Sequence, residues 1–181
     1  MPEQILRSPI AAAPIVTSDR PDPGIKLREL RPAGLALVAA WPETLDRVEQ
    51  VLAGQEQVLS LAPGRFLVVG ADTDPVPALR DSFDVATAAV TDIGQARSLF
   101  RVSGAPAADL LLKGLAIDLD AAAFPPGTTA QSAIHGIGVI LHRRDGETFE
   151  LYCFRGFALS LWEWLLDAGL EYGVVVEPSA F

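Results

Sequence analysis

The order of apolar segments along the chain is the feature that most constrains its fold. Short strand-like runs are separated by single amphipathic helices, and turn signals join strands directly between the helices. Pro63-Gly64 separates two such strands, and Arg144-Asp145-Gly146 separates another two. A doubly wound parallel sheet requires strict alternation of strand and helix, so these hairpins argue against it.

Taken in order, the segments predict a βαββαβ half followed by a βαβββαβ half. The first half is expected over about residues 33–90 and the second over about residues 91–176. In the second half, Leu99 and Phe100 are expected on opposite faces of a strand, and Ser103 is expected to cap the next helix. The predicted fold class is α+β: two ferredoxin-like halves with mixed or antiparallel sheets, and helices outside. Residues 33–181 are thus expected to form a single compact domain.

The N-terminal stretch differs from this body because it is rich in proline. Six prolines fall within residues 1–32. Since proline removes a backbone donor and restricts the residue before it, these residues are predicted to form an extended arm with little regular structure. Two alternatives stay open, a frayed terminus and an arm docked through apolar patches such as Ile5-Leu6. No basic region precedes an uninterrupted apolar run, so a signal peptide is not expected.

The charge balance limits the classes of partner. The 181 residues include 14 Lys and Arg against 23 Asp and Glu, a formal net charge of −9. An acidic chain without a basic block is a poor binder of nucleic acid or of an anionic membrane. No apolar run reaches the roughly 18 residues that span a bilayer. The single cysteine, Cys153, excludes an internal disulfide and suits a reducing compartment, so the expected location is the cytoplasm.

The sequence contains no fingerprint of a cofactor site or a catalytic nucleophile. The patterns GxxxxGK[ST], GxGxxG and GxSxG are absent. The nearest glycine pair, Gly136 and Gly138, leads into a strand, which favours a bend or bulge over a phosphate site. Two histidines and one cysteine are too few and too scattered for a zinc site. We therefore expect no catalytic, cofactor-binding or metal-binding residue in this chain.

Four reactive residues have a structural and a functional interpretation. Cys153 lies between bulky apolar residues, which favours a core thiol over a reactive thiolate. His135 and His142 are expected to be exposed or half-exposed surface residues rather than bases. Asp92 precedes Gly94 between two expected strands, where a carboxylate can fix a turn by accepting backbone hydrogen bonds. The alternative for Asp92 is a general base or a ligand-binding acid.

The last predicted helix, residues 157–168, is apolar over about 220° of its circumference. Only Ser160, Glu163 and Asp167 form a polar stripe. Such a helix must be covered on two sides, by the N-terminal arm, by the other half of the chain or by a partner protein. Tryptophan is favoured at interfaces. The interface candidates are the residues of its second apolar face, Leu159, Trp162 and Leu166.

The second half resembles the gamma subunit of heterotetrameric sarcosine oxidase. The resemblance rests on Asp92 with Arg97, the strand pair around Arg143-Arg144, and the segments RVSGAPAADLLLKG, DLDAAAFPPG and RGFALSLWEWLLDA. It is close over about residues 90–168 and looser through LSLAPGRFLVVG, where the family usually has tryptophan in place of Phe66. The family is similar to the aminomethyltransferase (T-protein) of the glycine cleavage system. That similarity implies an α+β fold of two ferredoxin-like halves.

The resemblance implies a non-catalytic structural subunit of a flavin-dependent complex. Such a complex oxidatively demethylates sarcosine to glycine, with H2O2 and methylene-tetrahydrofolate as products. The implied partners are the alpha, beta and delta subunits, which are expected to carry FAD, FMN, NAD and tetrahydrofolate, with no cofactor in this chain. One alternative is a stand-alone module of the T-protein fold that binds a folate-like ligand between the halves, with Asp92 as a contact. Another is an independent enzyme that uses Asp92 or a histidine.

Overall fold

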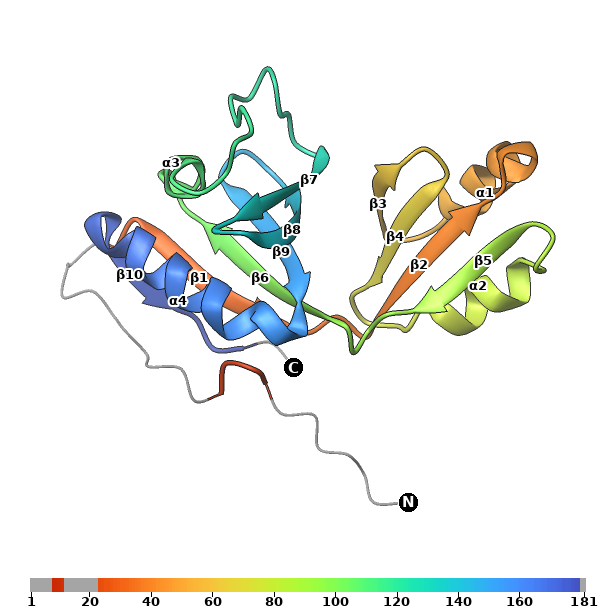
Figure 1. The fold of residues 1–181 in the computed structure, drawn as a ribbon, viewed down its shortest axis with the longest axis horizontal. Coiled ribbons are helices and arrows are strands. Elements are labelled where there is room, and N and C mark those ends of the chain that lie inside the picture. The colour runs from red at the N-terminus through yellow and green to blue at the C-terminus, as the bar shows by residue number, and fades with distance from the viewer. Residues whose placement is uncertain (1–7, 12–22, 180–181) are drawn as a thin grey trace.

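The computed structural model describes residues 8–11 and 23–179 and contains two β-sheets, each with helices on its outer face (Figure 1). We call the four-stranded sheet with helices α1 and α2 the small lobe. The six-stranded sheet with helices α3 and α4 is the large lobe. The predicted α+β class with two ferredoxin-like halves is confirmed.

The small lobe has the strand order of a ferredoxin-like fold. Its sheet order is β3-β4-β2-β5, and every neighbouring pair is antiparallel. This order results when two βαβ units interleave. Its elements are β2 (Gly34–Ala40), α1 (Leu45–Leu52), β3 (Gln57–Ala62), β4 (Arg65–Gly70), α2 (Val76–Ser82) and β5 (Ala88–Asp92).

The large lobe repeats that order and adds two strands. Its sheet order is β10-β1-β6-β9-β8-β7, in which β6, β8, β9 and β10 form the ferredoxin-like set. Strand β1 lies between β10 and β6, and β7 extends the opposite edge. The elements that follow the small lobe are β6 (Arg97–Ser103), α3 (Ala107–Leu112), β7 (Thr129–Ile134), β8 (Ile137–Arg143), β9 (Thr148–Phe154), α4 (Ala158–Gly169) and β10 (Val174–Val176).

Strand β1 (Ile25–Leu30) corrects the prediction that residues 1–32 have little regular structure. It pairs with β10 on one side and β6 on the other, and Ile25 and Leu27 are fully buried. Pro23 and Pro32 lie outside the strand, so neither removes a hydrogen bond from the sheet. The number of prolines therefore predicted an extended arm, although residues 25–30 alternate between buried and more exposed side chains as a strand does. The chain crosses from β1 into the small lobe and returns through β6 (Figure 1).

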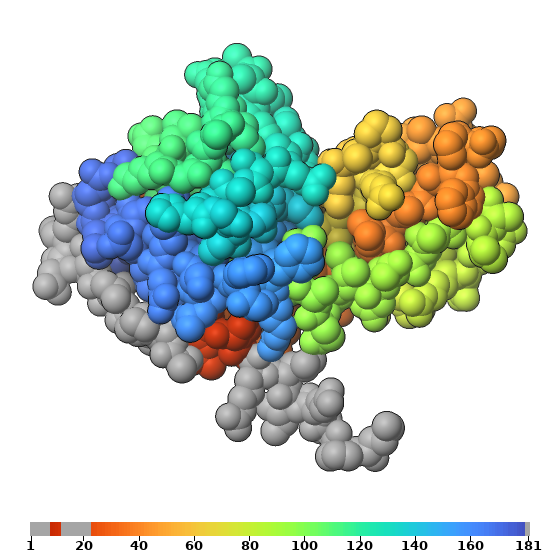
Figure 2. Space-filling model, in the orientation of Figure 1, coloured from red at the N-terminus to blue at the C-terminus, as the bar shows by residue number. Residues whose placement is uncertain are grey.

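Three apolar clusters hold the layers together. One lies between the large sheet and helices α3 and α4, and a second between the small sheet and helices α1 and α2. The third joins the inner faces of the two sheets. Leu99 belongs to this third cluster and Phe100 to the first, so the predicted alternation along β6 is confirmed. In Figure 2 the lobes meet where β3, in yellow, lies beside β7, in cyan.

Two turns differ from the sequence-based expectations. His135 and Gly136 both have positive φ, 48° and 78°, and form a two-residue hairpin loop between β7 and β8 rather than a bend or bulge. Consecutive positive φ angles are typical of a type I′ turn, which suits the twist of the flanking strands. Ser103 is the last residue of β6 and does not cap α3, whose N-cap is Pro106 without a side-chain bond.

The described part of the N-terminal arm is docked on the large lobe. Ser8 Oγ donates a 2.6 Å hydrogen bond to the carboxylate of Glu29, which is buried on β1. Ile10 packs against the large-lobe core. Glu29 also accepts a 3.3 Å bond from Ser179 near the other end of the chain. For residues 8–11 the docked alternative is therefore the observed one. Residues 1–7 and 12–22 lie outside the described residues.

Candidate functional site

The predicted interface helix is α4, and most of its apolar surface is covered by this chain itself. Trp162 is 2% exposed and Leu166 is 5% exposed, both within the large-lobe core. The Trp162 ring lies 5.2 Å from the ring of Phe100 on β6. The large sheet of their own half covers these two residues, so they are core residues in the structure and neither is exposed to a partner. Leu159, in contrast, is 41% exposed and is available to a partner.

Two exposed aromatic residues precede Leu159 along the chain, where β9 passes into α4. Phe154 ends β9 and is 51% exposed, and Phe157 immediately precedes α4 and is 52% exposed. We call Phe154, Phe157 and Leu159 the β9–α4 patch. The guanidinium carbon of Arg97 lies 3.8 Å from the centre of the Phe154 ring, a cation–π contact. Desolvation by this packing lowers the pKa of Arg97. The patch is thus bordered at Phe154 by one positive charge, that of Arg97.

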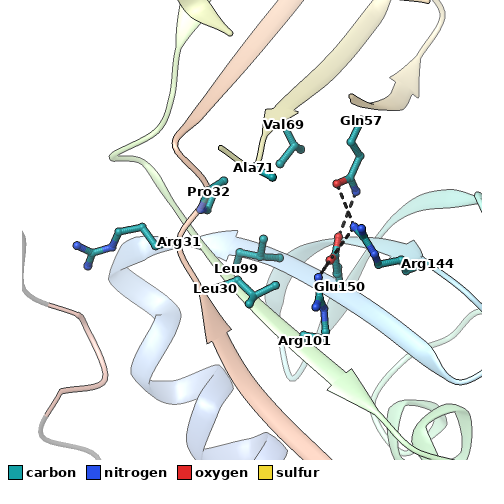
Figure 3. A pocket seen from close by; sticks show the side chains of 10 residues that line it. All are labelled: Leu30, Arg31, Pro32, Gln57, Val69, Ala71, Leu99, Arg101, Arg144 and Glu150. Atoms are coloured by element: carbon teal, nitrogen blue, oxygen red, sulfur yellow. Dashed lines mark hydrogen bonds and ion pairs between the residues drawn. The ribbon is translucent and has the colours of Figure 1, made fainter. Parts of the chain in front are cut away.

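A pocket of about 180 Å³ lies at the boundary between the lobes (Figure 3). We call it the inter-lobe pocket. It is lined from the large lobe by strands β1, β6 and β9 and from the small lobe by β3 and β4. The β1–β2 connection and the residue after β8 complete the lining. Its lining residues are Leu30, Arg31, Pro32, Gln57, Val69, Ala71, Leu99, Arg101, Arg144 and Glu150.

Glu150 is the charged centre of this region and is 1% exposed. Its Oε1 accepts a 2.7 Å hydrogen bond from Arg101 Nη2 and a 3.4 Å bond from Arg144 Nη1. Its Oε2 accepts bonds of 3.1 Å from Gln57 Nε2 and 3.2 Å from the Tyr152 hydroxyl. Gln57 belongs to the small lobe, so this carboxylate also joins the two lobes. Figure 3 shows Arg101, Arg144 and Gln57 converging on it.

These contacts decide the charge state of Glu150. Burial on its own would raise the pKa of this carboxyl, but hydrogen bonds from Arg101 and Gln57 and the positive charges of Arg101 and Arg144 oppose it. The net result is a lowered pKa. Burial and the neighbouring negative charge raise the pKa of Tyr152 well above its usual value. Glu150 is therefore an ionised, fully bonded carboxylate, which leaves it no free lone pair for use as a base.

His142 corrects one sequence-based expectation. It is 8% exposed rather than exposed or half-exposed, and it pairs with Glu150 across β8 and β9. Its Nδ1 lies 3.4 Å from the Thr129 hydroxyl. Burial lowers the pKa of His142, which favours the neutral ring. The inner face of β8 is covered by the small lobe and by neighbouring strands, and the local sequence contains no signal of that cover. His135, in contrast, is exposed in its hairpin turn, as predicted.

The other weighed residues have structural roles. Asp92 Oδ1 accepts a 2.9 Å hydrogen bond from the backbone N–H of Gly94, which confirms the turn interpretation. Cys153 is fully buried in the large-lobe core, and desolvation raises the pKa of its thiol to about 11. At neutral pH this sulfur is a protonated thiol rather than a nucleophilic thiolate. Neither residue lines the inter-lobe pocket.

Sequence reasoning missed the role of Arg143. Its side chain is 5% exposed and donates to the backbone carbonyls of Leu119, Phe124, Asp145 and Gly146 at 2.7–3.1 Å. These bonds hold the long α3–β7 loop against the β8–β9 turn. Arg143 was noted only as half of an Arg-Arg pair. Its position on the same face as Val139 and Leu141 was the signal that it points inward.

Within residues 8–11 and 23–179 no group of three or more His, Cys, Asp or Glu side chains is arranged to hold a metal ion. None of the helices in that same part of the chain is long and apolar enough to cross a membrane.

Comparison with known proteins agrees with the fold. The chain is similar to a chain of the heterotetrameric sarcosine oxidase from Corynebacterium sp. U-96, with a TM-score of 0.80 and 23% identity; the match covers 93% of this chain and 97% of that chain. It is also similar to the glycine cleavage system aminomethyltransferase T from Bartonella henselae, with a TM-score of 0.59 and 19% identity, over 87% of this chain and 48% of that chain. No curated protein gives a significant sequence match.

The sequence itself matches a defined protein family. Residues 27–171 fit the family described as "Sarcosine oxidase, gamma subunit family". The matched region begins in β1 and ends after α4, so it includes the small lobe, the large lobe except β10 and the start of β1, and the β9–α4 patch. Since the match covers most of the chain, this protein belongs to the sarcosine oxidase gamma subunit family.

Proposed function

We propose that this chain is the non-catalytic structural subunit of a heterotetrameric sarcosine oxidase. Its partners are the alpha, beta and delta subunits. The assembly oxidatively demethylates sarcosine to glycine and forms H2O2 and methylene-tetrahydrofolate. FAD, FMN, NAD and tetrahydrofolate are bound by the partner subunits, and this chain contributes binding surface. Membership of the gamma subunit family supports the proposal.

The observation that carries the structural role is the β9–α4 patch. Its three apolar side chains are 41–52% exposed within six consecutive residues, although the core beneath them is complete. Single exposed apolar residues are common, but three large ones within six residues of one segment favour a protein interface. Leu159 was already an interface candidate from the sequence. The patch is the surface on which we place the contact with a partner subunit.

The chemistry of the buried polar groups supports a role without catalysis. Glu150 has both oxygens occupied by donors. Cys153 is a buried thiol with a raised pKa of about 11. Asp92 is held by its own turn. A general base or nucleophile needs a free, reachable atom, and Glu150 and Cys153 do not offer one.

The alternative of a stand-alone folate-like module has weaker support. Drug-sized ligands occupy pockets of about 300–1,000 Å³. The inter-lobe pocket encloses about 180 Å³, and Asp92 is not among its lining residues. The residues present therefore do not fit a tetrahydrofolate molecule. Calorimetric titration of the chain with tetrahydrofolate tests this, and heat that saturates at millimolar ligand would restore the alternative.

Two properties of the chain are part of the same proposal. Residues 33–181 act as a single domain of two halves, and β1 (Ile25–Leu30) belongs to that domain because it lies between β10 and β6 in the large sheet. The apolar cluster between the sheets and the two chain crossings support one cooperative unit.

We place the protein in the cytoplasm, and the buried free thiol of Cys153 agrees with a reducing compartment.

Co-purification with the partner subunits tests the proposal. The chain is co-expressed with the three candidate partners, and assembly is measured by size-exclusion chromatography and flavin absorbance. The variant Phe157→Asp with Leu159→Asp is expected to fold but to elute apart from the flavin-containing subunits. Val85→Asp is the matched control, because Val85 is 82% exposed on the small lobe. Normal assembly of the double variant, or failure of the unchanged chain to assemble, would contradict the proposal.

A further inference from the structure

The inter-lobe pocket has more hydrogen-bond donors than acceptors. Three arginines, Arg31, Arg101 and Arg144, line it against one carboxylate, Glu150. The guanidinium groups of Arg101 and Arg144 lie beside that carboxylate, while the side chain of Arg31 points away from them (Figure 3). Both oxygens of Glu150 already accept two bonds each, so this side chain has no free lone pair to offer a ligand. A group that binds here must therefore supply acceptors.

Two of the arginines have donors to spare. Arg101 Nε is buried and has no hydrogen-bond partner, while Nη2 of the same guanidinium bonds to Glu150. A buried donor without a partner is costly to the folded state. Arg144 contacts Glu150 and Gln57 only at 3.4 Å, and its side chain is 49% exposed. Bonds of that length are weak, so Arg144 can turn toward another acceptor.

The remaining wall of the pocket is apolar. Leu30, Pro32, Val69 and Leu99 line it beside the arginines (Figure 3). The pocket of about 180 Å³ is slightly larger than the roughly 150 Å³ apolar cavity known to accept a benzene ring. A ligand that satisfies both walls has a small apolar body and an anionic end with oxygen acceptors.

We propose that the inter-lobe pocket binds a small organic monocarboxylate with an apolar body. The carboxylate lies against Arg101 and Arg144, whose planar guanidinium groups match its two oxygens. The apolar body lies against Leu30, Val69 and Leu99. The site is distinct from the β9–α4 patch and does not depend on the subunit role, so either proposal can fail without the other.

Titration of the full-length chain with benzoate tests this inference. Isothermal calorimetry or NMR chemical shifts measure the affinity at constant ionic strength. Benzoate is expected to bind saturably in the millimolar range, and benzyl alcohol, its neutral counterpart, at least about tenfold more weakly. Inorganic phosphate tests whether charge alone is enough, and it is expected to bind more weakly than benzoate.

Arg144→Gln is the informative variant, because Arg144 is half-exposed and its loss spares the core. It is expected to weaken benzoate binding about tenfold. Arg80→Gln is the control, an exposed arginine on α2 of the small lobe, and it should change the affinity less than twofold. No saturation by benzoate would overturn the inference. Equal affinity for benzoate and benzyl alcohol, phosphate binding as tight as benzoate, or equal weakening by the two arginine variants would do the same.

Discussion

The two lobes share one strand order but differ in what they bury. In the small lobe, Thr87 is the only buried polar side chain among the described residues. The large lobe buries five polar or charged side chains: Glu29, Ser98, His142, Arg143 and Glu150. Helices α3 and α4 cover one face of the large sheet, and the small-lobe sheet covers the middle of the other face. The added strands β1 and β7 widen this sheet. The same strand order therefore encloses an almost entirely apolar core in the small lobe and buried charged side chains in the large lobe.

The difference extends to the surface. The β9–α4 patch and the three arginines of the inter-lobe pocket belong to the large lobe or to the chain segment that joins it to the small lobe. The small lobe contributes the apolar residue Val69 and the amide of Gln57 to that pocket. We infer that the large lobe carries the binding surfaces and that the small lobe supports them from one side. Three substitutions test this division.

The largest expected effect is that of Arg143→Ala in the large lobe. The change removes four charge-assisted hydrogen bonds and leaves the carbonyls of Leu119 and Phe124 without a donor. The free energy of unfolding is expected to fall by about 4 kcal/mol, since each unsatisfied buried carbonyl is costly. Urea denaturation measures it. Arg65→Ala, at an exposed small-lobe position, should change stability by less than about 0.5 kcal/mol. Equal losses of unfolding free energy in Arg143→Ala and Arg65→Ala would contradict the proposed difference between the lobes.

Glu150→Gln is expected to have an intermediate, pH-dependent effect. At pH 7 the change removes the buried charge that Arg101 and Arg144 contact and lowers stability by about 2.5 kcal/mol. Because the folded-state pKa of Glu150 is lowered from 4.5, its contribution is complete above about pH 4.5 and is lost as the pH falls through the folded-state pKa.

The difference between Glu150→Gln and the unchanged chain should therefore shrink as the pH falls from about 4.5 through the folded-state pKa of Glu150. Denaturation curves recorded across that range measure it. Asp84→Asn in the small lobe is the comparison, because a hydrogen bond from Thr87 lowers the pKa of that exposed carboxyl. We expect Asp84→Asn to have a smaller effect. A constant difference for Glu150→Gln would show that its charge does not contribute to folding.

The smallest expected effect is that of Gln57→Ala, which removes the small-lobe partner of Glu150. Two hydrogen bonds across the lobe boundary are lost, one of 3.1 Å to Glu150 and a weaker one of 3.4 Å from Arg144, so the free energy of unfolding should fall by about 1 kcal/mol. Gln50→Ala on α1 is the control, because Gln50 is exposed. A second unfolding transition in Gln57→Ala, absent from the control, would mean that these bonds couple the lobes. An effect equal to that of Gln50→Ala would show that the contact of Gln57 with Glu150 does not stabilise the fold.

Most of the small lobe could be predicted from the sequence, because the signals that define its elements lie within a few residues of one another. Alternating strands, a proline at the start of a helix and the Pro63-Gly64 turn all act within a few residues. The charged centre was harder to find. Alternation in β9 places Glu150 and Tyr152 on one face, but only the packing of the second sheet shows that this face is covered. His142 was misplaced for the same reason, and β1 was missed because prolines flank it.

Hydrogen exchange with mass spectrometry tests the central claim most directly. Exchange is measured for the isolated chain and for the chain assembled with its partner subunits. If the β9–α4 patch is the contact surface, residues 154–159 become protected on assembly, and the small-lobe loop that contains Val85 stays unchanged. Protection that is confined to the small lobe, with residues 154–159 still exchanging freely, would contradict the account.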